Sequence, residues 1–167
     1  PMASLLESVP LRQPARARSE LIALSNSIPR EIEDHIQKLL VSAADPDAAI
    51  HYLVQLQQRQ PDAFHRIVRS PTGLQYLIAV FSHSHFLSGE ILQNPEWLDE
   101  LTGMNRVLSA PEYKRRLGKF LKARPEGTPL ALSLALFRRQ QILRILLRDV
   151  LGLGGLSVVT VELSNLA

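Results

Sequence analysis

Apolar residues recur along most of this chain with the three- and four-residue spacing that places them on one side of an α-helix. Before residue 125, such stripes occupy Ile32–Leu40, Ala49–Leu56, Leu74–Phe81 and Tyr113–Leu121. From Leu130 to Leu151 the pattern is long enough for one extended helix. Only Leu156–Val161, with its three valines, is also compatible with a β-strand. The hydrophobic pattern therefore predicts an all-α protein.

Proline residues mark the starts of the predicted helices, because the missing proline N–H would have no partner in the first turn anyway. The residue before proline can cap the helix in Asp45-Pro46, Ser70-Pro71, Asn94-Pro95 and Thr128-Pro129. Gln60-Pro61 and Ala110-Pro111 are weaker versions. Together these signals predict a multi-helix array or bundle of about eight to ten helices. We expect them near residues 16–25, 30–43, 46–59, 61–69, 72–82, 85–93, 95–102, 111–123, 129–151 and 156–166.

The composition is that of a globular protein, with 46% hydrophobic and 21% charged residues. The absence of cysteine excludes disulfides and thiolate metal sites. Pro1–Ser4 shows no basic region followed by an apolar run, so we expect no signal peptide. No stretch reaches the roughly 20 apolar residues that a transmembrane helix needs. We therefore expect a cytoplasmic protein without a membrane partner.

Charge is distributed unevenly along the chain. Residues 1–102 carry 8 basic and 12 acidic side chains, whereas residues 103–148 carry 11 basic and 2 acidic ones. This shift predicts a mixed-charge helical subdomain at 1–103 and a basic helical segment at 104–167. The basic half could face nucleotide phosphates, an acidic partner or nucleic acid, or it could be a solvated surface. Aromatic residues for base stacking are scarce there, so we do not expect nucleic-acid binding.

Three patterns that resemble chemical sites have a simpler explanation. The five histidines do not have the spacing of metal ligands. Asp45-Pro46-Asp47 falls at a predicted helix start, where its carboxylates would cap free N–H groups. Gly152–Gly155 lacks the lysine of a phosphate-binding loop and is typical of a helix C-cap. We therefore predict no catalytic, cofactor-binding or metal-binding residues in this chain.

The predicted 129–151 helix carries the densest group of charged side chains. The candidate functional residues are Arg138, Arg139, Arg144, Arg148 and Asp149. Arg144 and Arg148 share one stripe of this helix. Guanidinium groups so placed can bind carboxylates or phosphates, or they can equally pin the helix to its neighbours. Spacing alone does not decide between these two uses.

Two stretches, the second with a short continuation, carry distinctive motifs. Residues 81–101 contain the helix start Pro95-Glu96-Trp97-Leu98. Residues 137–149 follow the pattern F-R-R-x-x-x-L-R-I-x-x-R-D, and residues 161–167 are similar to R-E-L-S-x-L-A. With these motifs, the chain resembles the family of glutamine synthetase adenylyltransferase/adenylyl-removing enzymes over about residues 74–167. This order of segments also favours a helix for residues 156–166.

The resemblance implies a bifunctional enzyme that adenylylates and deadenylylates glutamine synthetase. In this family Mg²⁺ and ATP or ADP are bound by nucleotidyltransferase domains downstream of the arginine helix. The chain would then be a non-catalytic N-terminal helical region, acting as a scaffold and docking surface for the adjoining nucleotidyltransferase domain. Glutamine synthetase and a PII-type signal protein are the further candidate partners. The alternative is an independent helical module that binds an acidic partner through residues 103–148.

The same resemblance gives two expectations about individual residues. The arginine stripe would face the catalytic domain or the nucleotide phosphates. Without that domain, we expect Arg144 and Arg148 to be exposed or to pair with acidic residues of the first hundred. We also expect Trp97 to pack against the Phe81–Leu92 region.

Overall fold

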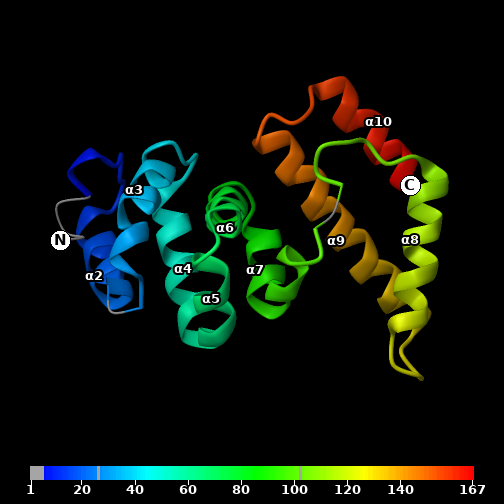
Figure 1. The fold of residues 1–167 in the computed structure, drawn as a ribbon, viewed down its shortest axis with the longest axis horizontal. Helices are drawn as coiled ribbons and strands as arrows, with labels where there is room; N and C mark the ends of the chain where they lie inside the picture. Colours follow the sequence, from blue (N-terminus) through cyan, green and yellow to red (C-terminus); the bar gives the residue numbers. More distant parts are fainter. Residues whose placement is uncertain (1–5, 26, 102) are drawn as a thin grey trace. The chain divides into compact units, whose positions relative to one another are not determined.

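The computed structural model describes residues 6–25, 27–101 and 103–167, and every regular element among them is a helix (Figure 1). This confirms the predicted all-α fold. The expectation about Pro1–Ser4 lies outside the described residues. Within the described ranges, no helix combines the length and the apolar character needed to cross a membrane.

The chain divides into two compact units, Pro1–Glu100 and Leu101–Ala167. The boundary predicted from the charge distribution lies between residues 103 and 104. Unit 1 contains the helices α2 (Pro14–Ser25), α3 (Glu33–Val41), α4 (Pro46–Arg59), α5 (Pro61–Val68), α6 (Pro71–His83) and α7 (His85–Gln93). It also contains the 3-10 helices η1 (Leu6–Ser8), η2 (Arg30–Ile32) and η3 (Pro95–Leu98). Unit 2 contains α8 (Ala110–Ala123), α9 (Leu130–Val150) and α10 (Leu156–Leu166).

Local capping explains why several helices begin where they do. Asp45 accepts a hydrogen bond from the N–H of Ala48 at 3.0 Å, and α4 begins at Pro46. Ser70 accepts one from the N–H of Gly73 at 3.2 Å, and α6 begins at Pro71. These contacts satisfy N–H groups that have no partner within the helix. The predicted helix starts at residues 46, 61 and 85 are confirmed.

Two of the predicted caps are wrong. The side-chain amide of Asn94 donates to the carbonyl of Glu90 at 3.1 Å, so it closes the end of α7 rather than the start of η3. The Thr128 hydroxyl donates to the carbonyl of Pro125 at 2.8 Å within a turn, and α9 begins one residue beyond Pro129. In both cases the polar side chain satisfies a nearby carbonyl of the preceding segment. The predicted helix at 95–102 is also shortened to η3, with residue 102 outside the described residues.

The core of unit 1 forms around α4, which packs against α2, α5 and α6. Its largest fully buried side chains include Leu24, Ile50, Leu53, Leu56, Phe64, Leu74, Leu77, Phe81 and Ile91. Trp97 in η3 is buried, and η3 packs on α7. The predicted burial of Trp97 beside this segment is therefore confirmed.

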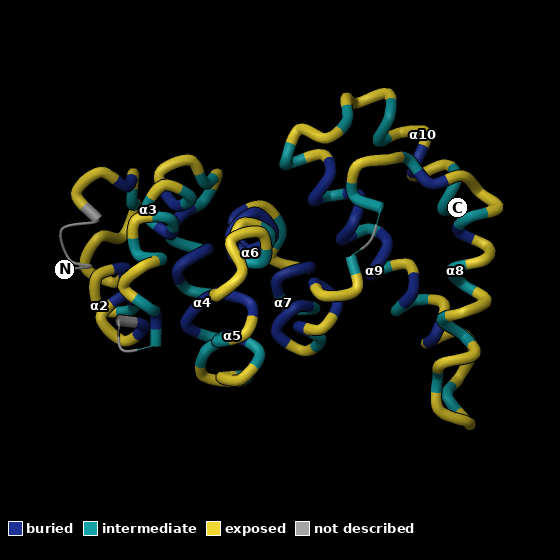
Figure 2. Tube along the Cα trace, viewed as in Figure 1, coloured by how far each residue is buried: buried dark blue, intermediate teal, exposed yellow. Residues whose placement is uncertain are grey.

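Unit 2 has a smaller apolar core. Its three helices pack against one another in pairs, around buried Leu108, Tyr113 and Phe137. Leu117, Phe120 and Leu166 cover this cluster. The predicted extended helix is confirmed as α9, which has 21 residues. Figure 2 shows that α9 alternates between buried and less buried positions along its length.

Candidate functional site

The five charged residues singled out on α9 fall into two groups in the structure. Arg138 and Asp149 are exposed, and Arg139 is half-buried. Arg144 and Arg148, by contrast, are only 1% and 3% exposed. The stripe that these two arginines share therefore faces the interior of unit 2, where a charged group needs a partner.

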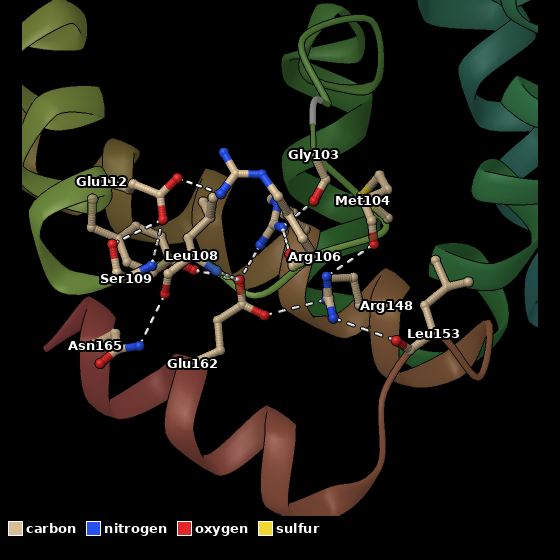
Figure 3. Close-up of polar contacts among 12 residues, drawn as sticks. Gly103, Met104, Arg106, Leu108, Ser109, Glu112, Arg148, Leu153, Glu162 and Asn165 are labelled. Atoms are coloured by element: carbon tan, nitrogen blue, oxygen red, sulfur yellow. Dashed lines mark hydrogen bonds and ion pairs between the residues drawn. The ribbon is translucent and has the colours of Figure 1, made fainter.

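That partner is Glu162 on α10, itself 1% exposed (Figure 3). The Nη1 of Arg144 binds Oε1 of Glu162, and the Nε of Arg148 lies 3.2 Å from Oε2. Each carboxylate oxygen thus has its own guanidinium. Oε1 also accepts hydrogen bonds from the Leu108 N–H and the Tyr113 hydroxyl, each at 3.1 Å. We call Arg144, Arg148 and Glu162 the buried charge cluster.

The remaining guanidinium donors hold the loop that leads into α8. Arg144 Nη2 donates to the carbonyls of Gly103 and Arg106, the latter at 2.6 Å. Arg148 Nη1 donates to the carbonyl of Met104 at 3.0 Å, and its Nη2 donates to the carbonyl of Leu153 at 3.4 Å. Carbonyl groups in a loop have no N–H partner within a helix. When such carbonyls are buried, they need another hydrogen-bond donor. The two arginines therefore connect three separate segments to α9.

A further pair of contacts fixes α10 against the same loop. Glu162 accepts from the N–H of Leu108, and the side-chain amide of Asn165 donates to the Leu108 carbonyl at 3.0 Å. Residues three apart share one helix face, so both contacts come from the same side of α10. Leu108 is fully buried, and α10 thereby satisfies both polar groups of its backbone.

The electrostatics of the buried charge cluster keep Tyr113 as a hydrogen-bond donor. Burial raises the pKa of Tyr113, and the negative charge of Glu162 raises it further. The phenol therefore stays protonated at neutral pH. Burial also lowers the pKa of Arg116, and the nearby charge of Arg144 adds to that effect. Arg116 thus lies close enough to Arg144 for the two positive charges to repel each other.

The start of α8 has its own ion pair beside the buried charge cluster. Ser109 and Glu112 form a capping box, in which the Ser109 N–H and hydroxyl each donate to Glu112 at 2.9 Å. Arg106 also binds the Glu112 carboxylate. The hydrogen bond from the Ser109 backbone, followed by the one from Arg106, lowers the pKa of Glu112 to about 2.

The turn after α9 returns the chain toward the buried charge cluster. Gly152 has a φ of +69°, which favours glycine. The Gly152 N–H donates to the Asp149 carbonyl at 3.0 Å, and the Leu153 N–H donates to the Arg148 carbonyl at 2.8 Å. This hydrogen-bond pair is the Schellman C-cap. The predicted C-cap role of the glycine-rich segment is confirmed.

Residues 74–167 match the sequence profile of the family described as Glutamate-ammonia ligase adenylyltransferase. The chain belongs to this family. It is also similar to the bifunctional glutamine synthetase adenylyltransferase/adenylyl-removing enzyme of Chromobacterium violaceum, with 27% identity over 161 residues. That match covers 94% of this chain and 17% of the relative, so the chain spans about a sixth of the relative's length. No solved structure gave a significant match.

The family match covers every residue of the buried charge cluster and its loop, from Gly103 to Asn165. The resemblance stated from residues 74–167 is confirmed. The expectation that Arg144 and Arg148 are exposed or pair with the first hundred residues is wrong. Their carboxylate comes instead from α10, because the turn at Gly152 folds that helix back along α9. A docking role for the exposed Arg138 and Asp149 and for Arg139 stays a prediction.

Sequence reasoning missed Glu162 as the partner. A usable signal was present: Glu162 is the one acidic residue of α10, which is otherwise uncharged and mostly apolar. A carboxylate that is fully buried needs a paired cation. The two arginines four residues apart on α9 carry the complementary charge.

The Asp45-Pro46-Asp47 motif and the five histidines lie in unit 1. Asp47 of the Asp45-Pro46-Asp47 motif accepts hydrogen bonds from the N–H groups of Arg12 and Gln13 at 2.8 and 2.9 Å. Asp45 caps the start of α4 as predicted. The prediction is wrong for Asp47, which binds N–H groups just ahead of α2 instead of those of its own helix. His83 ends α6 and His85 begins α7. Ser84 lies between them and caps the start of α7. Across the described part of the chain, no three His, Asp or Glu side chains gather as a possible metal site.

Unit 1 also contains a pocket of about 320 Å³ between the start of α2 and α4. Its wall includes Arg16, Glu20, His51, Tyr52 and His85. Glu20 lies 3.0 Å from Arg16 and 2.9 Å from His51. Arg16 and His51 thus both contact the Glu20 carboxylate, and sequence spacing gave no sign of this arrangement.

Proposed function

We propose that this chain is a non-catalytic helical region of a bifunctional enzyme that adenylylates and deadenylylates glutamine synthetase. In that enzyme it serves as a scaffold and docking surface for an adjoining nucleotidyltransferase domain. Family membership and the printed activity of the Chromobacterium violaceum relative support this proposal. The chain spans 17% of that relative, so the activity belongs to a much longer polypeptide.

The observation that carries the scaffold role is the position of Glu162 between Arg144 and Arg148. Two charge-assisted contacts at full burial fix both the register and the rotation of α10 against α9. Apolar packing alone tolerates small shifts, whereas a misplaced buried charge is costly. A domain attached to α10 would therefore be held in one defined orientation.

The carboxylates of unit 2 do not fit a magnesium site. Mg²⁺ takes oxygen ligands in near-octahedral geometry, and nucleotidyl transfer needs carboxylates that converge on it. Glu112 is engaged in the capping box and Glu162 in the buried charge cluster. Glu126 and Asp149 lie near opposite ends of α9, roughly 30 Å apart along a helix of this length. Mg²⁺ and ATP or ADP would be bound by the remainder of the polypeptide.

The scaffold role is tested in the full-length enzyme with Glu162→Gln, using Glu126→Gln as a control of equal charge change on an exposed residue. Adenylylation and deadenylylation of glutamine synthetase are measured for both. We expect Glu162→Gln to lower both rates at least about tenfold and the control to leave them unchanged. Unchanged rates in Glu162→Gln would contradict the scaffold role. Release of ADP from adenylylated glutamine synthetase by the 167-residue chain, with phosphate and Mg²⁺, would contradict its non-catalytic character.

One observation favours the alternative of an acidic partner. The exposed face of α8 carries four cations: Lys114, Arg115, Lys119 and Lys122. The aromatic rings of residues 103–148 pack in the core of unit 2 and are not presented for stacking on nucleic-acid bases. This supports a protein as the acidic partner. Glutamine synthetase and a PII-type signal protein are the candidates within this family. Replacing the four cations by glutamine should abolish co-purification with such a partner and leave enzyme stability unchanged.

A further inference from the structure

Helix α8 exposes a face on which every charged side chain is a cation. The helix buries Tyr113 and packs Leu117 and Phe120 against the core of unit 2. Figure 2 shows exposed positions along its length. The face opposite the core consists of the exposed residues Pro111, Lys114, Arg115, Gly118, Lys119 and Lys122. Their spacing keeps them on one continuous side of the helix, which we call the outer face of α8.

The four cations of the outer face differ from the inner cations of unit 2 in their partners. Arg144 and Arg148 bind Glu162, and Arg106 binds Glu112. Within the described ranges, no ion pair or hydrogen bond engages the four outer side chains. The folded unit therefore pairs the cations at its interior and leaves those of the outer face unpaired.

This arrangement works against the stability of α8. Arg115 and Lys119 are four residues apart, and Lys119 and Lys122 are three apart. Like charges at these spacings repel each other and destabilise a helix. The helix dipole favours Lys122 in the last turn but gives no support to Arg115. Local arrangements that cost stability are expected where a protein has a function to perform.

Gly118, in the middle of the outer face, has no explanation within the chain. Glycine inside a helix is less stable than alanine. Gly118 has no positive φ, and a Cβ at this position would meet none of the described atoms within 4 Å. Unit 2 would therefore accommodate a larger residue. A missing side chain on the surface leaves room for the backbone of a partner to approach α8 between its cations.

The charges and the glycine together match an acidic helix. Carboxylates three or four residues apart on a helix lie about 5–6 Å from one another, which is the spacing of the outer cations. Packed helices have axes about 8–10 Å apart, and the side chains at the contact set this distance. Gly118 allows a short distance. Lys114 and Lys119 flank it and can reach carboxylates on both sides of the contact.

Other anionic partners match the outer face less well. A helix that lies on a membrane carries large apolar side chains beside its cations, whereas the apolar member here is Pro111. Single-stranded nucleic acids stack their bases on aromatic side chains, but Tyr113 and Phe120 pack in the core. A nucleic-acid duplex would contact the ends of the long side chains and would not need the space at Gly118.

We propose that the outer face of α8 binds an acidic α-helix of a protein partner, with the backbone of that helix closest to α8 at Gly118. This inference rests on the second candidate function, the binding of an acidic partner, and adds the kind of structure that the partner presents. The four cations attract the partner and make association sensitive to salt. Gly118 restricts the contact to a segment that packs closely against α8.

Binding of a stapled helical peptide tests this proposal. The probe carries glutamates three and four residues apart on one side with alanines between them, and fluorescence anisotropy measures its affinity for the 167-residue chain. We expect Gly118→Gln to weaken binding at least about tenfold, because a side chain inserted into a close contact must push the probe away. The matched control is Gly89→Gln in α7, where a Cβ would also meet none of the described atoms within 4 Å. The control should bind as tightly as the unchanged chain. Equal affinities for Gly118→Gln and the unchanged chain would overturn the proposal.

Two further measurements identify the cause of any loss. Gly118→Gln should raise the melting temperature of the chain, since glutamine favours a helix more than glycine does. Weaker binding then does not come from unfolding. A DNA duplex is the second probe, and its binding should not respond to Gly118→Gln. If the duplex binds more tightly than the peptide, the outer face recognises phosphates and the proposal is wrong.

This proposal and the acidic-partner function fail in different ways. Replacing the four cations by glutamine removes the attraction, whereas Gly118→Gln keeps every charge. If only the cation replacement abolishes binding of glutamine synthetase or the PII-type protein to the full-length enzyme, the acidic partner stands and the close helical contact is wrong. If neither change weakens binding, both are wrong.

Discussion

Removal of the Glu162 carboxylate is the perturbation that tests the most contacts at once. In Glu162→Ala, Arg144 and Arg148 remain buried at 1% and 3% exposure without an anion. The Leu108 N–H and the Tyr113 hydroxyl lose their acceptor as well. Glu162→Gln keeps the size of the side chain and one acceptor oxygen, so it separates the loss of charge from the loss of hydrogen bonds.

The expected loss follows from the burial of the pair. Removing one partner of a buried ion pair typically costs about 3–5 kcal/mol, because an uncompensated charge remains. Each unsatisfied buried donor adds roughly 1–3 kcal/mol unless water reaches it. For a unit of this size, 1 kcal/mol shifts the melting temperature by about 4–8 °C. We therefore expect unit 2 of Glu162→Ala to melt at least about 12 °C lower.

Hydrogen exchange resolved by peptide is the appropriate assay, because it reports on each unit separately. Peptides from α10 and from the loop at 103–108 should lose protection in Glu162→Ala. Peptides from α4 and α6 in unit 1 provide an internal reference. Glu126→Ala removes the same charge from an exposed loop position and should change protection in neither unit.

A small effect would refute this reasoning. If Glu162→Ala lowers the free energy of unfolding of unit 2 by less than about 1 kcal/mol, Glu162 behaves as a surface residue. If Glu162→Gln is as stable as the unchanged chain, the negative charge is not what holds the two arginines.

Three further predictions concern other residues. Arg148→Glu places a second carboxylate beside Glu162 and should destabilise unit 2 by more than about 3 kcal/mol in urea unfolding, whereas Arg138→Glu at an exposed position should stay within about 0.5 kcal/mol. Trp97→Ala should cost about 3–5 kcal/mol in the same assay, the range for a buried aromatic, and a loss below about 1 kcal/mol would place Trp97 on the surface. The pKa of Glu112 is lowered from 4.5 to about 2, so its contribution to stability is present above pH 4.5 and disappears as the pH falls toward 2. The difference in urea midpoint between the unchanged chain and Glu112→Gln should therefore shrink over that range, and a constant difference would contradict the assignment.

The sequence by itself determined most of the helices. Proline at a helix start, an Asp or Ser before it and apolar residues three and four apart act over distances of a few residues. For this reason α4 and α7 begin and end where the sequence predicted. The two predicted caps that failed, Asn94 and Thr128, are also local. Each side chain could accept from N–H groups of the element that follows or donate to a carbonyl of the segment before it, and each makes the second contact. Propensity does not settle such a choice.

Only the tertiary structure decided what the arginine stripe of α9 does. The spacing of Arg144 and Arg148 predicted that they act together, but it left open whether they bind a ligand or pin neighbouring segments. Their partners lie far along the chain: Glu162 is 18 residues from Arg144, and the Gly103 carbonyl is 41 residues away. These groups meet because Gly152 turns the chain and α10 packs back on α9. A buried charge is stable only where such distant groups converge, and that convergence is a property of the folded chain.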